Sequence, residues 1–337
     1  MYRLDEKLAR ILAGKYTRKD FIIADAKDPD MGGGVPSYGP AAAGSGRRFR
    51  TREEFLDDIA AIVKQDIVDI MLCSASNLEK LVERGVFKGS AVKPAFRAND
   101  TTDIWPLRGA IYHKQPCRPF RSASIPHVMY GQATPAPGKP HYLTDLGLYS
   151  MTFNNDLDAD VASMDAFAQF RDDATANGLK YFLEVFNPNV DTGIPPADLP
   201  HYINDSIVRV LAGVVQAQRP LFLKIAYNGP KALEELASHD STLIVGLLGG
   251  GAGTTRDTFE LLHQGEKYGA RIALFGRKIK QAESPLAIVK LMRAVVSGEV
   301  SPDEGVKAYH GELQKASLKA GRALADDNQV TEAVLKH

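Results

Sequence analysis

Cysteine is scarce in this chain, which has only Cys73 and Cys117 among its 337 residues. Two cysteines are too few for a disulfide framework or for a metal site built of thiolates. The sequence also lacks an apolar run near the ~18 residues that would cross a bilayer, and its first residues lack the apolar core of a secretory signal. We therefore expect a cytoplasmic protein that does not enter a membrane.

An excess of charge of either sign is missing as well, because 41 Lys and Arg residues balance 41 Asp and Glu residues. The most basic cluster is the short segment 46–50, which is too small to create the extended basic surface that nucleic acid needs. Nucleic acid is therefore not an expected partner.

The overall composition is that of a globular protein, with 44% hydrophobic residues, 24% charged residues, 29 Gly and 19 Pro. This composition excludes intrinsic disorder, collagen and coiled coil. The length allows one large domain or two. We favour a single domain over residues 1–337, with an N-terminal helix within 1–18 and a helical extension at 302–337.

Short apolar runs alternate with amphipathic segments along the chain, after a first helix that ends near Gly14. The runs predict strands at 21–25, 67–72, 92–97, 148–153, 181–186, 220–227, 243–247 and 271–276. The amphipathic segments predict helices at 51–65, 76–83, 156–176, 206–218, 230–237, 254–268, 285–296 and from 302 to about 324. Thr51 and Glu54 form a capping-box pattern at the start of one helix, whereas Pro94 is unusual inside a strand.

Eight apolar strands separated by helices predict an α/β protein of the closed (β/α)₈ barrel type, the TIM barrel. The alternative is an open doubly wound sheet. Segment 25–30, where the first strand ends, argues against this alternative because it lacks the Gly-x-Gly-x-x-Gly pattern by which such sheets bind dinucleotides. Two long segments interrupt the pattern, 31–46 after the first strand and 99–143 after the third. Both are expected to lie on the same rim of the barrel.

Lys224 lies inside the apolar run 220–227, where a charged side chain is costly. A buried lysine either pairs with a carboxylate or loses its proton, and a neutral amine is a nucleophile. At the rim of a barrel such an amine can condense with a substrate carbonyl to form a Schiff base, which is the chemistry of lyases. The alternative is that Lys224 only forms an ion pair with Glu184 from the neighbouring strand.

Two acidic residues also lie in strand runs, Asp25 at the end of the first and Glu184 in the fifth. Asp25 is expected to orient substrate hydroxyls or move a proton, or alternatively to cap the following loop. Glu184 is a candidate proton carrier or the ion-pair partner of Lys224. Lys27 and Arg97 stand near strand ends and are possible substrate-binding residues, although single basic residues there are often solvated.

Glycine-rich turns follow the last two strands. Segment 249–254 contains Gly249, Gly250 and Gly251 and opens a helix, and Gly276 with Arg277 follows the eighth strand. Backbone without side chains can approach an anion closely, and barrels commonly hold phosphate after their seventh and eighth strands. These turns predict a phosphate-binding site.

Polar residues at the fourth strand are possible substrate ligands as well, among them Tyr149, Ser150, Thr152 and the pair at 154–155. His113, His127 and His141 show no metal-ligand spacing, so we predict no metal site.

Residues 145–300 resemble the class I (Schiff-base) aldolases of the superfamily that contains deoxyribose-phosphate, tagatose-bisphosphate and archaeal-type fructose-bisphosphate aldolases. The resemblance rests on the lysine of Leu223-Lys224-Ile225, the turn Gly249-Gly250-Gly251 and the Gly276-Arg277 pair before a helix. It implies that Lys224 forms the Schiff base and that the phosphate is held by backbone at Gly250, Gly251 and Gly276 and by Arg277.

The first-strand aspartate of these enzymes resembles Asp25, but their Asp-His-Gly is Asp25-Ala26-Lys27 here. Their fourth-strand tyrosine position is taken by Thr152, and Tyr149 is offset by three residues.

The leading hypothesis is a lyase that cleaves or forms a C–C bond in a phosphorylated sugar or keto compound and needs no cofactor. The alternatives are an acyl transferase acting on a phosphorylated dione, like the thiolase relative of these aldolases, and a non-catalytic phosphosugar-binding protein. We also expect a homo-oligomer.

Overall fold

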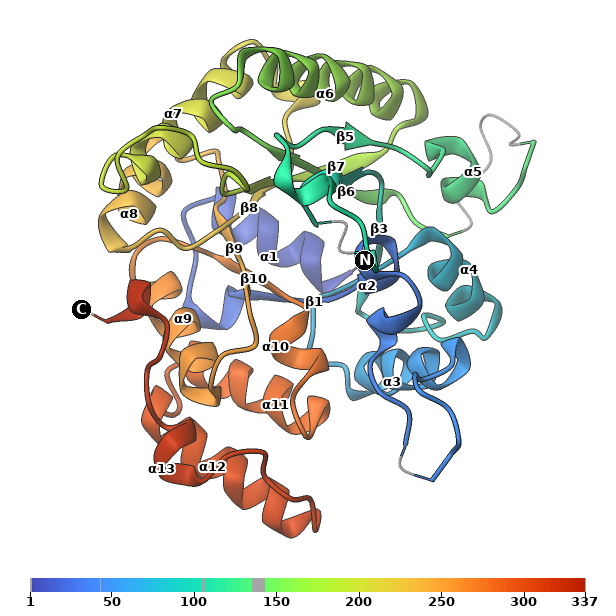
Figure 1. Cartoon of the computed structure of the whole chain (residues 1–337), viewed down its shortest axis with the longest axis vertical. Helices are drawn as coiled ribbons and strands as arrows, with labels where there is room; N and C mark the ends of the chain where they lie inside the picture. Colours follow the sequence, from blue (N-terminus) through green and yellow to red (C-terminus); the bar gives the residue numbers. More distant parts are fainter. Residues whose placement is uncertain (1, 43, 105–106, 135–142, 337) are drawn as a thin grey trace.

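A closed barrel of eight parallel strands forms the centre of the computed structural model, which describes residues 2–42, 44–104, 107–134 and 143–336 (Figure 1). The barrel strands are β1 (Ile22–Lys27), β2 (Ile70–Cys73), β3 (Lys93–Arg97), β6 (Leu146–Thr152), β7 (Lys180–Phe186), β8 (Leu223–Ile225), β9 (Gly246–Leu248) and β10 (Ile272–Phe275). Each of them overlaps one of the predicted strands, and Pro94 lies within β3. The predicted (β/α)₈ barrel is therefore confirmed, and the open sheet is excluded.

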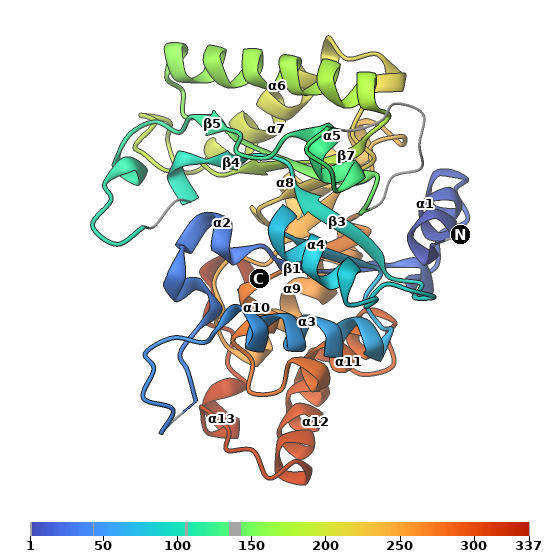
Figure 2. The same ribbon diagram turned by 90° about the vertical axis from the view of Figure 1, so that its right-hand side faces the viewer.

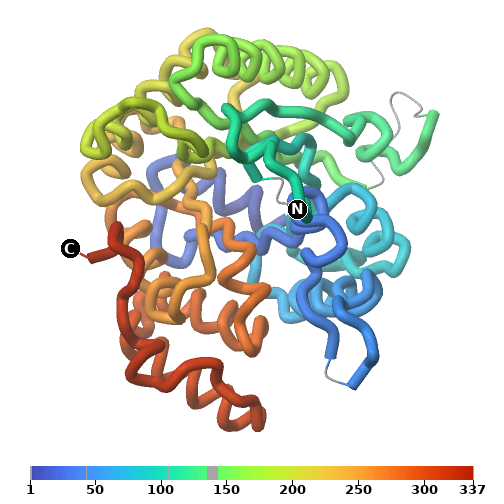
Figure 3. The backbone as a smooth tube through the Cα atoms, viewed as in Figure 1, coloured from blue at the N-terminus to red at the C-terminus, as the bar shows by residue number. Residues whose placement is uncertain are grey.

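The ring closes where the first strand meets the last. Ile22 is in register with Ile272, and Asp25 with Phe275, while β1 also pairs with β2 on its other edge. Figure 3 shows this contact as a blue segment beside an orange one. Because the strands are parallel, all their carboxyl ends open at the same end of the barrel.

Helices cover the outside of the barrel (Figure 1). They are α3 (Arg52–Gln65), α4 (Ala75–Glu83), α6 (Leu157–Asn177), α7 (Leu199–Ala212), α8 (Pro230–His239), α9 (Thr255–Lys267), α11 (Pro285–Val296) and α12 (Pro302–Lys315). No helix among the described residues combines the length and the apolar character that a membrane crossing requires.

Three predicted helix boundaries, in two helices, are wrong. Helix α7 begins at Leu199 rather than at 206, because Pro200 occupies its first turn, where a missing N–H does no harm, and it ends before Gly213 rather than at 218. Helix α12 ends at Lys315 rather than near 324, because Ser317 adopts the left-handed conformation (φ 54°) that cannot continue a helix. A separate short helix, α13 (Leu324–Asp327), follows.

Apolar side chains fill two layers, one between strands and helices and one inside the barrel. The inner layer contains alternate strand residues such as Ala24, Leu148 and Phe182. Leu4 and Leu8 of α1 (Arg3–Leu12) belong to the same cluster. Helix α1 therefore closes the amino end of the barrel, on the side of the molecule opposite α2, β4 and β5 (Figure 2).

Two inserts lie at the carboxyl end. The insert after β1 contains α2 (Pro29–Gly33) and the 3₁₀ turn Val35–Tyr38. The insert after β3 contains β4 (Asp100–Thr101), a 3₁₀ turn at Thr102–Ile104, another at Tyr112–Lys114, β5 (Pro119–Phe120) and α5 (Ile125–Tyr130). They touch each other, because a Cβ on Gly32 would lie 2.8 Å from the Ile104 carbonyl oxygen. As expected, they share one rim.

Helix α3 begins with the predicted capping box. Thr51 Oγ1 accepts a hydrogen bond from the Glu54 N–H at 3.3 Å, and the Glu54 carboxylate accepts one from the Thr51 N–H at 2.7 Å. We expect Thr51→Ala to lower the free energy of unfolding by about 1 kcal/mol, because an orphan helical N–H loses its acceptor. Urea unfolding checks this value. Thr51→Ser, which retains the hydroxyl, should match the wild type, and an equal loss in both variants would contradict the capping role.

Candidate active site

A cavity of about 600 Å³ lies at the carboxyl end of the barrel. Its walls come from the ends of β1, β3, β7, β8, β9 and β10, from both inserts and from α10 (Arg277–Lys280). The sequence-predicted residues that line it are Lys224, Glu184, Arg97, Gly249, Gly250, Gly276 and Arg277. The fold thus brings together in one cavity residues that are far apart in the sequence.

Lys224 and Glu184 form an ion pair on neighbouring strands, with Nζ 2.6 Å from Oε1. Both side chains are buried, since Lys224 is 5% exposed and Glu184 is 1% exposed, and both line the cavity. They belong to the inward-facing residues, as do their strand neighbours Phe222 and Phe182 at the barrel centre. The amine therefore sits in a cavity wall beside a carboxylate that can exchange a proton with it.

Glu184 has a second set of partners through its other oxygen. Oε2 accepts a hydrogen bond from Ser150 Oγ at 2.7 Å and lies 3.5 Å from the Arg97 guanidinium. Ser150 is fixed in turn by Asn99, whose side-chain oxygen accepts a hydrogen bond from the Ser150 N–H at 2.6 Å. The Glu184 carboxylate is thus oriented by contacts that do not depend on Lys224.

Arg97 is buried in the cavity wall among three carboxylates. Its nearest ion pair is with Asp28 at 2.7 Å, and it also lies 3.7 Å from Asp100 and 3.5 Å from Glu184. Burial alone would lower the pKa of Arg97, but these three acids outweigh it and raise the pKa above its ordinary value. Burial also raises the pKa of Asp100 to about 6, despite the attraction of Arg97. The positive charge of Arg97 is therefore largely neutralised inside the protein.

Asp28, Asp103 and Lys280 line the cavity but were not among the predicted site residues. Asp28 directly follows β1 and precedes Pro29, so a carboxylate just beyond a strand end was the signal that could have identified it. Asp103 lies in the 99–143 segment, whose sequence shows no regular pattern. Its carboxylate accepts hydrogen bonds from Thr152 Oγ1 at 2.7 Å and from Cys117 Sγ at 3.3 Å. Thr152 thus supports the wall through Asp103.

Gly249, Gly250 and Gly276 form the wall beside β9 and β10, while Gly251 does not line the cavity. Gly250 adopts φ +64°, and a Cβ on Gly276 would lie 2.8 Å from the Ala26 carbonyl oxygen, so both positions favour glycine. Arg277 is exposed on this wall. Lys280 stands nearby, and burial, together with the positive charges of Lys27 and Arg277, lowers its pKa.

Asp25 and Lys27 do not line the cavity, contrary to expectation. They lie on the outward-facing side of β1 with Ile23, between the strands and the helices. Asp25 is fully buried, and Lys27 Nζ lies 3.3 Å from its Oδ2, yet neither Asp25 oxygen accepts a hydrogen bond from the described residues. The structure therefore separates this pair from Lys224.

The pH dependence of stability should reveal the buried carboxyl of Asp25. Burial raises its pKa from 3.8 to about 6, although Lys27 opposes this. The folded state therefore binds a proton more tightly than the unfolded state, so stability contributed by the protonated carboxyl is lost as the pH rises through this window. We expect the free energy of unfolding of the wild type, relative to Asp25→Asn, to decrease from about pH 4 to about pH 6 and then to level off. Urea unfolding of both proteins at each pH measures this, and parallel curves would show that the pKa is not raised.

Tyr149 also lies outside the cavity, and its proposed role in substrate binding is not supported. It points outward from β6 and stacks on Phe170 of α6, with ring centroids 4.4 Å apart. Its neighbour Ser150 points inward. The side-chain alternation of a strand explains this difference.

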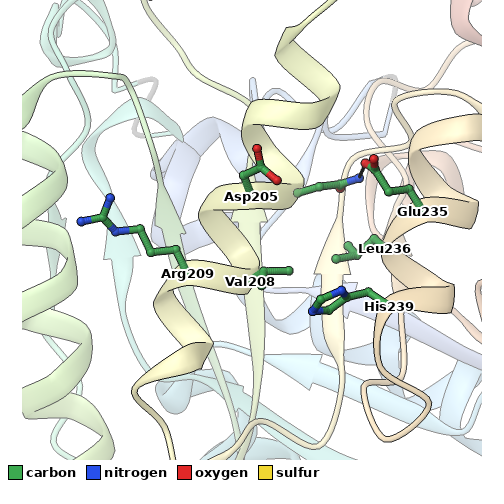
Figure 4. A pocket seen from close by; sticks show the side chains of 7 residues that line it. Asp205, Val208, Arg209, Glu235, Leu236 and His239 are labelled. Carbon is green, nitrogen blue, oxygen red and sulfur yellow. Dashed lines mark hydrogen bonds between the residues drawn. The ribbon is translucent and has the colours of Figure 1, made fainter.

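A second groove, of about 320 Å³, lies between the outer helices α7 and α8. Val208 of α7 faces Leu236 and His239 of α8 across it (Figure 4). None of the predicted site residues lines this groove. No set of three or more His, Cys, Asp or Glu side chains in the described part of the chain is arranged to hold a metal ion, and His141 lies outside that part.

No protein-family model and no curated protein sequence matches the chain. Among solved structures, it is similar to an archaeal fructose 1,6-bisphosphate aldolase, with 17% identity, 88% of this chain and 99% of the other covered, and a TM-score of 0.59. A Schiff-base-forming fructose-1,6-bisphosphate aldolase gives 17% identity, coverage of 87% and 99%, and a TM-score of 0.60. A Corynebacterium glutamicum protein has 19% identity and a TM-score of 0.56, and the match covers 88% of this chain and 98% of the other. At these identities the likeness establishes the shared barrel fold.

Proposed function

We propose that this protein is a Schiff-base aldolase that cleaves or forms a C–C bond in a phosphorylated sugar or keto compound. The observation that carries the proposal is the amine of Lys224, held 2.6 Å from the Glu184 carboxylate in the wall of the cavity at the carboxyl end of the barrel. Active sites of (β/α)₈ enzymes lie at this end. The sequence resemblance and the barrel shared with two aldolases support the same reaction.

In the proposed reaction, Glu184 takes a proton from the Lys224 ammonium, and the free amine adds to the substrate carbonyl carbon. The carbinolamine then loses water with proton help from the same carboxyl group, which leaves a protonated imine. This cation withdraws the electron pair of the adjacent C–C bond as that bond breaks, while a base removes the proton of the substrate hydroxyl and an aldehyde leaves. Protonation of the resulting enamine and hydrolysis of the imine regenerate the amine. The electron sink is the imine itself, so the reaction requires no cofactor.

Glu184 is the proposed proton carrier because it contacts the amine directly. Its Oε2 accepts a hydrogen bond from Ser150, which keeps the carboxylate oriented while the proton moves. A hydroxyl from the fourth strand and Asp25 were the other candidates, but Asp25 lies on the outward-facing side of β1 and does not line the cavity.

The phosphate of the substrate is proposed to bind at Gly249, Gly250 and Gly276, with Arg277 and Lys280 supplying positive charge. Side-chain-free backbone allows close approach of the anion, and charge-assisted hydrogen bonds strengthen binding. Gly251 is outside the cavity and is left out of this site.

Borohydride trapping tests the proposal. The protein is incubated with a panel of phosphorylated ketoses and aldehydes, reduced with borohydride and digested for mass spectrometry. We expect a stable mass increase on the peptide that carries Lys224, together with release of an aldehyde from the ketose. Tight ligand binding without an adduct would instead indicate a phosphosugar-binding protein, and product formed only with a thiol acceptor would indicate an acyl transferase.

We also propose that residues 1–337 form one domain, that the protein is cytoplasmic and that it is a homo-oligomer. Light scattering on the purified protein measures the last of these.

A further inference from the structure

The walls of the cavity differ in charge on its two sides. Arg277 and Lys280 stand on the side of β9 and β10. The glycine turns, which are Gly249 and Gly250 after β9 and Gly276 after β10, lie on the same side. Lys280 donates a hydrogen bond to the Ser37 carbonyl, and neither basic side chain is ion-paired with a carboxylate among the described residues. This side therefore offers two positive charges to an anion.

The opposite side belongs to the insert after β3. Asp103, Ile104 and His113 line it together with Phe186 at the end of β7. Asp103 is anchored to Thr152 of β6, and β6 is four strands away from β10 in either direction around the ring. The acid therefore lies three to four strands around the ring from the glycine turns after β9 and β10, with Lys224 of β8 between the two sides.

The remaining guanidinium in the cavity does not change this asymmetry. Arg97 is surrounded by Asp28, Asp100 and Glu184, which neutralise its charge. A second phosphoryl group on the Asp103 side would thus meet the Asp103 carboxylate, the His113 imidazole and the apolar side chains of Ile104 and Phe186, with no lysine and no arginine except the neutralised Arg97 among the described residues that line the cavity there. Like charges brought together in a confined site repel strongly.

We infer that the substrate carries a single phosphoryl group, bound at the glycine turns, and an uncharged hydroxyl-bearing end that lies against Asp103. The inference rests on the proposed function and narrows its substrate class. A carboxylate oxygen that already accepts one hydrogen bond can accept another, so Asp103 can bind a substrate hydroxyl while it excludes a second phosphate. Compounds phosphorylated at both ends are then poor ligands.

Calorimetric titration of the full chain tests this with fructose 1-phosphate, fructose 6-phosphate and fructose 1,6-bisphosphate. We expect one of the monophosphates to bind on the order of tenfold more tightly than the bisphosphate. Asp103→Asn, which removes the charge and keeps the shape, should tighten bisphosphate binding by roughly threefold or more and should not tighten binding of the preferred monophosphate, whose hydroxyl loses a charged acceptor. Asp165→Asn on the exposed face of α6 is the matched control and should change neither. Arg277→Ala should weaken all three ligands, because each uses the shared phosphate site.

Wild-type protein that binds the bisphosphate as tightly as the better monophosphate would overturn the inference, and the aldolase proposal would stand. An unchanged preference in Asp103→Asn would overturn the role of Asp103. If that variant does not fold, the relative affinities of the wild type for the three ligands still decide whether the substrate carries a single phosphoryl group. Failure of all three compounds to bind would overturn the phosphate site and this inference with it.

Discussion

Replacement of Lys224 by methionine is expected to reduce turnover of a cleavable substrate by on the order of 10³-fold or more and to abolish the borohydride adduct. Methionine fills a similar volume but cannot condense with a carbonyl. The fold should survive, because Glu184 retains Ser150 and Arg97 as partners after the amine is lost. Steady-state kinetics and intact-mass measurement after reduction give both readouts.

Lys93→Met is a matched control for this experiment. Lys93 is also a buried lysine on a barrel strand and is ion-paired with Asp145, but it stands at the start of β3, away from the cavity. We expect its loss to reduce stability while kcat/KM changes by less than about threefold. Equal turnover by Lys224→Met and the wild type would contradict the aldolase proposal, because the imine formed at Lys224 is the only electron sink in the proposed mechanism.

Asp69→Asn should produce the largest loss of stability, about 3–5 kcal/mol, because it leaves one buried and two partly buried cations without their counter-ion. Asp69 is fully buried just before β2 and forms ion pairs with Arg3 at 2.8 Å, Lys7 at 2.8 Å and Arg293 at 2.9 Å. Its carboxylate also accepts a hydrogen bond from the Ile23 N–H of β1 at 2.8 Å. One side chain therefore joins α1, α11 and two barrel strands. Urea unfolding at neutral pH measures the loss.

Asp66→Asn provides the control, since it makes the same chemical change at another partner of Arg3. Asp66 is half-exposed, so its pair at 3.3 Å should contribute less than about 1 kcal/mol. Asparagine also tolerates the left-handed backbone that Asp66 adopts (φ 58°). Similar losses in the two variants would show that the burial of Asp69 does not matter.

Acid should erase the difference between the wild type and Asp69→Asn. Burial would raise the pKa of Asp69, but Lys7 and Arg293 outweigh it and hold the pKa below its ordinary 3.8. The stability from this carboxylate is therefore complete above that pH and lost as the pH falls through the lower folded value. Unfolding curves recorded at decreasing pH should converge.

Most of the strands were predictable from the sequence because they are largely apolar runs whose residues are buried on both faces. The same property hid the direction of each side chain. A half-exposed strand alternates polar and apolar residues, but 21–25 does not, so the sequence could not show that Asp25 points toward the helices. Tyr149 was misassigned for the same reason.

Lys224 and Glu184 were easier to identify, because an ionisable residue within an apolar run is conspicuous on either face. Asp103 could not be found this way. Its place in the cavity depends on hydrogen bonds from Thr152 and Cys117, which come from other parts of the chain. The glycine-rich turns were identified from local composition, but only the folded chain shows that Gly251 does not line the cavity.

The pairing of β1 with β10 has a consequence for biosynthesis. The edge of β1 at Asp25 can pair only after Phe275 of β10 has been synthesised. A nascent chain that ends before β10 therefore has an open sheet. Its unpaired main-chain groups are open to association with other chains, and shielding by chaperones would protect them until synthesis passes this point. The cavity at the carboxyl end of the barrel, which is lined by residues from Ala26 to Gln281, accordingly becomes complete only after β10 has been synthesised.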